Sequence, residues 1–430
     1  MTTPGRRRVA VAAALLLSGF TSAARAAEPE LLRDVVDKEY PSLEKLYTSL
    51  HTTPELSLRE EKTSKRLADE LRAAGYEVTE RVGGFGVVAV LKNGPGKTLL
   101  IRTDLDALPV REETGAAYAS SATAKDPAGK DVPVMHACGH DVHMTCLVGT
   151  ARAMAAAKDK WSGTLVLIGQ PAEEVLRGAR AMLADGLFTR FPRPDFGLAL
   201  HVDPELAAGQ VGVVAGPSMA SSNSVDIVVR GVGGHGAAPH ATKDPVVIAA
   251  QLVLNLQTIV SREVKPTDPV VVTVGSIHGG TKHNIIPDEV TLQLTVRTYD
   301  EDVRKQVFAA IERIAKGTAA TAGVPKDREP VVTFHEGVPP TVNTRELVER
   351  VTATFRGVLG EANVIRSEPR MGAEDFGLYG RTEPKVPIFM YRLGSVPAER
   401  IKASREPGGA PLPSLHSSKY LPDREPTIRT

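Results

Sequence analysis

Hydrophobic residues follow two different spacings along the first half of the chain, and each spacing predicts one kind of element. Short apolar runs predict buried strands at residues 87–91, 98–101, 164–168 and 196–200. Apolar positions four residues apart, as at Leu67 and Leu71, predict helices at residues 63–74, 144–157 and 177–184. Because strands alternate with helices, we predict an α/β domain with a mostly parallel sheet.

The pattern changes after Gly216. Alternating apolar residues predict strands at residues 224–230, 269–277, 290–298 and 331–334. Longer apolar stripes predict two helices, 245–260 and 301–316, the second ending at Gly317. The order strand, helix, strand, strand, helix, strand is that of a ferredoxin-like (βαββαβ) unit. We therefore predict an inserted domain, residues 218–337, between two parts of the first domain, residues 28–217 and 338–430.

Residues 1–27 have the features of a secretory signal peptide. Three arginines, Arg6 to Arg8, precede an apolar run over residues 9–20, and Ala24-Arg25-Ala26 offers small residues for cleavage. The run is too short to span a bilayer, and the arginine pair also fits twin-arginine export. An uncleaved anchor is the alternative. We expect an exported protein, periplasmic or secreted, that is free of the membrane after processing and has no later segment apolar enough to span it.

Composition argues against one class of partner. Aromatic residues make up 4% of the chain, and the formal net charge is +1. A nucleic-acid groove needs stacking aromatics and a basic surface. We therefore predict no nucleic-acid partner.

Five side chains of metal-binding type are spread over four short stretches of the chain. They are Cys138, His140, Glu174, His201 and His416. A thiolate, three imidazoles and a carboxylate suit two divalent ions such as zinc, manganese, cobalt or nickel better than calcium or magnesium. Three of the stretches follow predicted strands or begin helices, and α/β sheets carry their sites at the carboxyl ends of strands. Taken singly, each histidine is a core or surface residue, so the prediction depends on the set.

The chain has two cysteines, Cys138 and Cys146, eight positions apart. If the chain is helical from Asp141 onward, a disulfide between them is strained. We predict free thiols, with Cys138 as a metal ligand and Cys146 as a small core residue. An alternative makes Cys138 a nucleophile with a histidine base.

Carboxylates lie beside these ligands in the sequence. Adjacent residues point in different directions, so Glu174 can bind metal while Glu173 faces a substrate, takes a proton from water and returns it to a leaving nitrogen. A solvated acidic loop is the alternative for this pair. Asp104 and Asp106, at a predicted strand end, are candidates to orient the ligands or the base, or to cap the strand.

Three residues of the inserted domain are candidates for substrate binding. His235 lies in a glycine-rich loop, Asn284 in a turn and Arg297 at a strand end. An imidazole, an amide and a guanidinium suit a carbonyl and a carboxylate. From chemistry alone, a turn-forming asparagine and a surface arginine are the alternatives.

The chain resembles the hippurate hydrolase and indole-acetyl-amino-acid hydrolase branch of the dinuclear metal amidohydrolases. The matching stretches cover nearly the whole mature chain and are His51-Thr-Thr-Pro-Glu-Leu56, Arg102-Thr-Asp-Leu-Asp-Ala-Leu-Pro109, Met135-His-Ala-Cys-Gly-His-Asp-Val-His143, Gly169-Gln-Pro-Ala-Glu-Glu174, Leu200-His201, Gly233-Gly-His-Gly-Ala-Ala-Pro-His240, Asn284-Ile-Ile-Pro287, Met371-Gly-Ala-Glu-Asp-Phe376 and Leu415-His416-Ser417. The resemblance implies a metal-binding catalytic domain, an inserted lid that is also the dimerisation surface, and a homodimer or higher homo-oligomer.

The resemblance also implies a role for each matched residue. Cys138 would bridge two metal ions, and the other four ligands would complete their coordination. Glu173 would be the general base and then the acid, and His235 would reach across from a partner's inserted domain to stabilise the oxyanion. The remaining matches would be Asn284 and Arg297 as substrate contacts and Glu374 in a loop beside the site.

We therefore expect an exported, metal-dependent amidohydrolase that cleaves N-acyl or N-aroyl amino acids or similar small conjugates. A carboxypeptidase or dipeptidase on the same scaffold is the close alternative, and a non-catalytic binding protein is the alternative from another class. The family continues after its last histidine into a terminal helix. Residues 422–426 carry no apolar run, so we expect either that the helix is lost or that the sequence is cut short.

Overall fold

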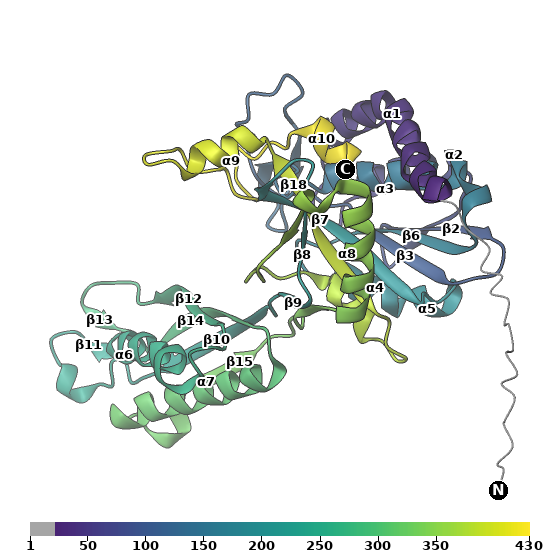
Figure 1. Ribbon diagram of the computed structural model, residues 1–430. Coiled ribbons are helices and arrows are strands. Elements are labelled where there is room, and N and C mark those ends of the chain that lie inside the picture. Colours follow the sequence, from purple (N-terminus) through teal and green to yellow (C-terminus); the bar gives the residue numbers. More distant parts are fainter. Residues whose placement is uncertain (1–21) are drawn as a thin grey trace, which may run out of the picture.

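The computed structural model describes residues 22–430, with side chains from residue 34 onward. Most of the predicted signal peptide, residues 1–21, lies outside the described residues. The larger body contains an eight-stranded sheet in the order β1-β2-β6-β3-β7-β18-β8-β17 (Figure 1). Its strands are β1 Glu77–Val82, β2 Gly86–Asn93, β3 Thr98–Asp104, β6 Gly163–Gln170, β7 Phe196–Ala207, β8 Val211–Val213, β17 Val364–Arg366 and β18 Ile388–Val396. Strands β6, β3, β7 and β18 are parallel neighbours, which confirms the predicted α/β class with a mostly parallel sheet.

Helices cover both faces of this sheet. Alternate residues of β2 belong to two separate hydrophobic cores, Val87 and Ala89 to one and Val88 and Val90 to the other, because successive strand residues point to opposite faces. The first core contains α1 Ser22–Thr52, α2 Glu61–Ala73 and α3 His140–Ala156, and the second contains α4 Gly178–Ala184 and α5 Leu187–Arg190. The remaining helices of this body are α8 Arg345–Leu359, α9 Ala398–Arg405 and α10 Arg424–Arg429.

Helix α3 begins four residues earlier than predicted. Its N-cap, Gly139, has a φ of 81°, a left-handed conformation that costs glycine little. The turn at Gly139 places His140 in the first turn of the helix and Cys138 just before it. The cap thus brings two candidate ligands to the same end of one helix.

The smaller body is a four-stranded antiparallel sheet in the order β12-β14-β10-β15, set apart from the larger sheet in Figure 1. Its elements are β10 Asn223–Arg230, α6 Pro245–Thr258, β12 Val270–Gly279, β14 Glu289–Thr298, α7 Glu301–Thr321 and β15 Val331–Phe334. The chain order and the antiparallel pairing are those of the predicted βαββαβ unit. Helices α6 and α7 and the sheet enclose a hydrophobic core of their own.

Helix α7 does not end at Gly317 as predicted but continues to Thr321. A glycine inside a helix costs about 1 kcal/mol relative to alanine. Thr318 and Ala319 are buried in the next turn, and Asn255 of α6 donates a hydrogen bond of 3.0 Å to the Thr318 hydroxyl. This packing offsets the weak helix propensity of the glycine.

Helix α6 runs into a π-helical turn, Ile259–Glu263. Together these residues are long and apolar enough to cross a bilayer by length and composition, with a mean hydropathy of 1.3, so the expectation that no later segment reaches this level is wrong. Ile248, Leu252 and Leu256 are buried in the core of the smaller body. Part of the apolar content of this helix is therefore a core-facing stripe.

Two connections join the smaller body to the larger one. Strand β9 Gly216–Met219 leads into β10, and β16 Thr341–Asn343 returns, and these two strands pair antiparallel. A further bridge joins Ser222 to Val338. The two connections thus form one paired ribbon.

The chain ends in a short helix, α10, where we expected the terminal helix to be lost. Thr427 and Ile428 are buried, and the Arg429 guanidinium lies 4.2 Å from the centre of the Tyr40 ring. Ile428 belongs to the same core as α1 and α3. One buried isoleucine and a cation–π contact replace a longer apolar stripe here.

Candidate metal centre

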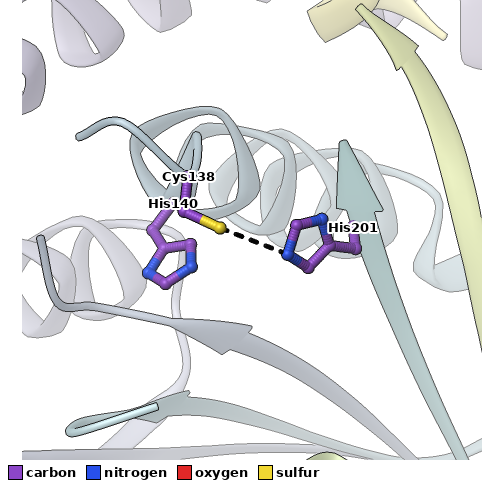
Figure 2. A group of neighbouring side chains, drawn as sticks. All are labelled: Cys138, His140 and His201. Carbon is purple, nitrogen blue, oxygen red and sulfur yellow. Dashed lines mark hydrogen bonds between the residues drawn. The ribbon is translucent and has the colours of Figure 1, made fainter. Parts of the chain in front are cut away.

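The candidate ligands lie at one edge of the larger sheet. Strand β6 ends at Gln170, three residues before Glu173, and β7 carries His201. We predicted that this strand ends at residue 200. In the structure β7 continues through His201 to Ala207. Figure 2 shows Cys138 and His140 at the start of α3, opposite His201 on its strand. Glu173 thus follows the carboxyl end of a parallel strand, whereas His201 lies within β7, just beyond the residues that pair with β3.

Two groups of ligand atoms share the Cys138 thiol. The first group is Cys138, His140 and His201, and the second is Cys138, Glu174 and His416; within each group all ligand atoms lie within 4.8 Å of one another. The Cys138 Sγ atom is 3.5 Å from His201 Nε2 and 3.3 Å from His416 Nε2. The structure therefore brings the five predicted ligands together in two sets with a common member.

The hydrogen bonds around these side chains leave lone pairs that can coordinate cations. His140 donates from Nδ1 to the Asp106 carbonyl at 2.7 Å, and His201 donates from Nδ1 to the Val202 carbonyl at 2.9 Å. Each hydrogen bond fixes the proton on Nδ1 and leaves the Nε2 lone pair to coordinate a metal ion. His140 Nε2 and Glu174 Oε1 are buried without a hydrogen-bond partner and lie 3.8 Å apart. Unpaired buried acceptors around a shared thiol fit two divalent ions.

Protons compete with cations at this centre. Burial raises the pKa of the Cys138 thiol well above its usual value, and the charges of Glu174 and Glu173 raise it further. Burial alone lowers the pKa of His140, but the carboxylates of Asp104 and Asp106, with Glu174, raise it to about 10. Thiolate and neutral imidazole are the metal-binding forms, so ion uptake must release protons.

Glu173 belongs to neither of these two groups, but its carboxylate lies within 4.8 Å of the ligand atoms of His140 and Glu174. It is 5% exposed, and its carboxylate lies within 4.8 Å of the carboxylates of Glu374 and Asp375. Burial raises the pKa of Glu173 well above its usual value, and the charges of Glu374 and Glu174 raise it further. A carboxyl group whose pKa is raised in this way is suited to accept and return a proton.

Arg102 is a buried cation to which the sequence analysis gave no role. It donates to Asp104 at 2.7 Å and to Glu374 at 2.8 Å, and all three side chains are at most 1% exposed. The Asp375 carboxylate lies 3.6 Å away. The position of Arg102 inside an apolar strand could have indicated this role, because a buried arginine needs carboxylate partners.

The two predicted orienting aspartates act by different routes. Asp104 accepts a 2.7 Å hydrogen bond from Nδ1 of His143, whose Nε2 accepts from the Val202 backbone beside His201. Asp106 holds His140 through its carbonyl, and its carboxylate accepts from the Glu174 backbone at 2.9 Å. His143 was not singled out from the sequence, although its i+3 spacing from His140 places both on one face of α3.

A cavity of about 370 Å³ opens onto the centre, and we call it the metal cavity. Its lining includes Arg297 of β14 and these residues of the centre: Cys138, Glu173, Glu174, His201 and His416. His235 and Asn284 do not line it. His235 lies on β11 Gly234–His235, which pairs with β13 Ile285–Ile286 next to Asn284, and both residues are exposed. Within one chain, only Arg297 of the three predicted substrate contacts reaches the metal cavity.

A buried thiol shared by two groups of candidate ligands, with the Glu173 carboxylate beside it, is the arrangement expected of a dinuclear metal hydrolase. Comparison with known proteins agrees, because residues 100–406 match peptidase family M20/M25/M40. The chain belongs to this family, and it is a metal-dependent hydrolase of amide C–N bonds whose cofactor is a pair of divalent ions.

Three similar proteins illustrate the range of the family. Hippurate hydrolase of Campylobacter jejuni is 39% identical over 81% of this chain and 87% of its own length. Thermostable carboxypeptidase 2 of Saccharolobus solfataricus is 37% identical over 87% of this chain and 89% of its own. The solved structure of the Bacillus subtilis YXEP protein, described as a dinuclear metal binding peptidase, has a TM-score of 0.73 and 28% identity over 91% of this chain and 96% of its own.

Proposed function

We propose that the protein hydrolyses the amide bond of N-acyl or N-aroyl amino acids, or of similar small conjugates, and releases an acid and an amino acid. The proposal depends on one observation. The metal cavity is lined by four of the five candidate ligands, by Glu173 and by Arg297. An acylated amino acid needs a proton acceptor near its amide and a cation near its carboxylate. The similarity to hippurate hydrolase supports this substrate class.

Each residue has a chemical task in this reaction. When bound, two divalent ions supply a Lewis acid for the carbonyl oxygen and acidify water. Glu173 takes the proton of the attacking water and returns it to the leaving nitrogen. Arg297 holds the carboxylate of the amino acid in a two-pronged hydrogen bond. The Arg102 guanidinium holds the Glu374 carboxylate in a 2.8 Å ion pair beside Glu173.

The substitution Glu173→Gln tests this assignment. Glutamine keeps the shape of the side chain and removes the base, so we expect hippurate hydrolysis to fall at least about 100-fold while elemental analysis finds the ions retained. Glu346→Gln, at an exposed position on α8, is the matched control and should keep full activity. Full activity in Glu173→Gln would refute the role.

Removal of the ions separates the metal reaction from a thiol reaction. We expect a chelator to abolish hydrolysis and added divalent ions to restore it. Hydrolysis that continues after complete chelation would favour Cys138 as the nucleophile.

Peptide hydrolysis is the second candidate, and the similarity to thermostable carboxypeptidase 2 favours it. Rates on hippurate and on a free dipeptide, measured with the same enzyme and ions, distinguish the two. A higher kcat/KM on the dipeptide would replace the first proposal with the second.

We also propose a homodimer formed through the smaller body, residues 218–337. Strand β12 is an edge of its sheet, and Ile277 on it is 54% exposed. On α6, Val247 and Leu254 are 53% and 70% exposed. An exposed apolar helix beside a free strand edge favours pairing with a second copy. The partner's His235 would then serve as the oxyanion donor that one chain leaves outside its own metal cavity.

Leu254→Glu should convert this dimer to a monomer, measured by light scattering during gel filtration. Val331→Glu on β15, at the opposite edge of the same sheet, introduces the same charge and should leave the dimer intact. A dimer that persists in Leu254→Glu, or is lost in both variants, would contradict the proposed interface.

We propose export as the cellular route, on the basis of the signal-like residues 1–27. N-terminal sequencing of protein from the periplasm or medium should begin after Ala26 or Ala27. Protein that starts at Met1 and stays inside the cell would contradict this proposal.

A further inference from the structure

A second cavity adjoins the metal cavity. It measures about 400 Å³ and lies between residues 202–205 of β7 and the loop 411–415; we call it the side cavity. Arg370, Arg392 and Leu415 line both cavities. A substrate that reaches the metal centre therefore has adjoining space beside it, entered past two arginines.

Arg392 lies next to the metal centre in the sheet. It is the in-register neighbour of His201 on the parallel pair β7 and β18, and residues opposite each other on paired strands project to the same face. Both side chains line the metal cavity. Arg392 is thus built into the sheet beside a metal ligand, and its position is rigid.

The Arg392 side chain is buried without a counterion. It is 4% exposed, and its Nη2 atom has no hydrogen-bond partner. Among the described residues, 34–430, no carboxylate lies within 4 Å of its guanidinium nitrogens. Arginine stays charged in proteins, and an unpaired buried charge is costly. Burial lowers the pKa of Arg392, and the nearby charge of Asp203 raises it in part.

The other arginine of the side cavity is already neutralised. Arg370 forms ion pairs of 2.9 Å with Asp203 and 3.0 Å with Glu205. These carboxylates are the acidic side chains that line the side cavity, and both are engaged by Arg370. The two carboxylates balance the two arginines in charge, but both contact Arg370, so Arg392 has no carboxylate of the chain in direct contact and can accept one from a bound molecule.

We propose that Arg392 binds a carboxylate of the substrate, and that the preferred substrates are amide conjugates with a second carboxylate. The inference rests on the proposed function, in which Arg297 holds the carboxylate of the amino acid. Arginine binds carboxylates through two parallel hydrogen bonds, and the side cavity provides room for the second acidic arm. That arm belongs either to the acyl group or to the amino-acid side chain.

Three substrates test the preference and locate the second carboxylate. N-acetyl-L-alanine has one carboxylate, N-succinyl-L-alanine has a second on the acyl group, and N-acetyl-L-glutamate has a second on the side chain. We expect the metal-loaded enzyme to favour one of the two diacids. In Arg392→Met the kcat/KM for that diacid should fall about 10- to 100-fold more than for N-acetyl-L-alanine, mainly through KM. Arg392→Lys should restore part of the preference.

The controls separate substrate binding from a structural role. Arg356→Met removes an exposed arginine of α8 that lines neither cavity, so it should leave the rates on all three substrates unchanged. Elemental analysis should find both ions retained in Arg392→Met. Loss of the ions, or an equal fall in kcat/KM for all three substrates, would show that Arg392 supports the metal centre and does not bind the second carboxylate of the substrate.

A binding measurement tests, without turnover, whether Arg392 binds a second carboxylate. Calorimetry with the metal-loaded wild-type protein should show tighter binding of glutarate than of butyrate, and Arg392→Met should lose this difference. If the enzyme cleaves neither hippurate nor any of the three amides, the proposed function fails, while the glutarate preference still tests Arg392. Equal binding of glutarate and butyrate by the wild-type protein would overturn the proposal, even if the Arg392 variants fail to fold.

Discussion

His51 should make the stability of the protein fall as the pH rises from 6.5 to about 9. It donates from Nδ1 to Asp141 at 2.7 Å and from Nε2 to Glu112 at 3.1 Å, and the three side chains are at most 1% exposed. Both ring nitrogens donate only when the imidazole is protonated. Burial alone lowers the pKa of His51, but the hydrogen bonds to Asp141 and Glu112 raise it to about 9, from 6.5.

The sign and size of the effect follow from this pKa. Because the folded-state pKa lies above the unfolded value, the contribution is complete below pH 6.5 and is lost as the pH rises through about 9. A shift of this size is worth roughly 3 kcal/mol of unfolding free energy. At pH 7.5 somewhat more than half of it should remain.

Urea unfolding of the metal-free protein measures this contribution, since bound ions add a pH dependence of their own. The comparison is with His51→Gln, in which glutamine keeps one amide donor and cannot become charged. The difference in unfolding free energy between the two proteins should shrink by roughly 3 kcal/mol between about pH 6 and about pH 9.5. Ionisations that the two proteins share cancel in this difference. A constant difference across that range would show that His51 is not charged in the folded protein.

Three further substitutions test the frame around the metal centre. Arg102→Met leaves buried carboxylates without their cation and should cost about 3–5 kcal/mol of unfolding free energy; an unchanged urea midpoint would contradict this. Gly139→Ala forces a φ of 81° on alanine and places its Cβ 2.6 Å from Val202, so bound metal should fall in elemental analysis, whereas Gly408→Ala, with a φ of 79° in open space, should keep its metal. Cys138→Ala should bind fewer ions per chain, and in the wild type the raised thiol pKa should weaken ion binding as the pH falls, measured by metal titration at two pH values.

Local patterns predicted much of the fold. Short apolar runs and helical spacing are properties of neighbouring residues, so β2, β3, β6 and the βαββαβ unit could be read from the sequence. Strand β18 was missed because Tyr391 and Arg392 interrupt its apolar run, and only its place between β7 and β8 makes it a strand. The start of α3 was missed because it depends on the left-handed turn at Gly139.

The candidate ligands could be predicted for a different reason. Each of these residues has a common alternative when taken singly, so the set of residue types and the family resemblance together indicated the five that the structure brings together. The supporting cations and the second histidine could not be predicted in this way. Arg102, His143 and Arg392 owe their importance to partners, or to a missing partner, that are distant in sequence.

The paired ribbon of β9 and β16 joins the two bodies that together line the metal cavity. All five candidate ligands come from the larger body, while Arg297 comes from the smaller one, beyond the ribbon. A swing of the smaller body about this ribbon would withdraw Arg297 without moving any ligand. Product could then depart, and the next substrate enter, while the side chains that would hold the ions stay in place.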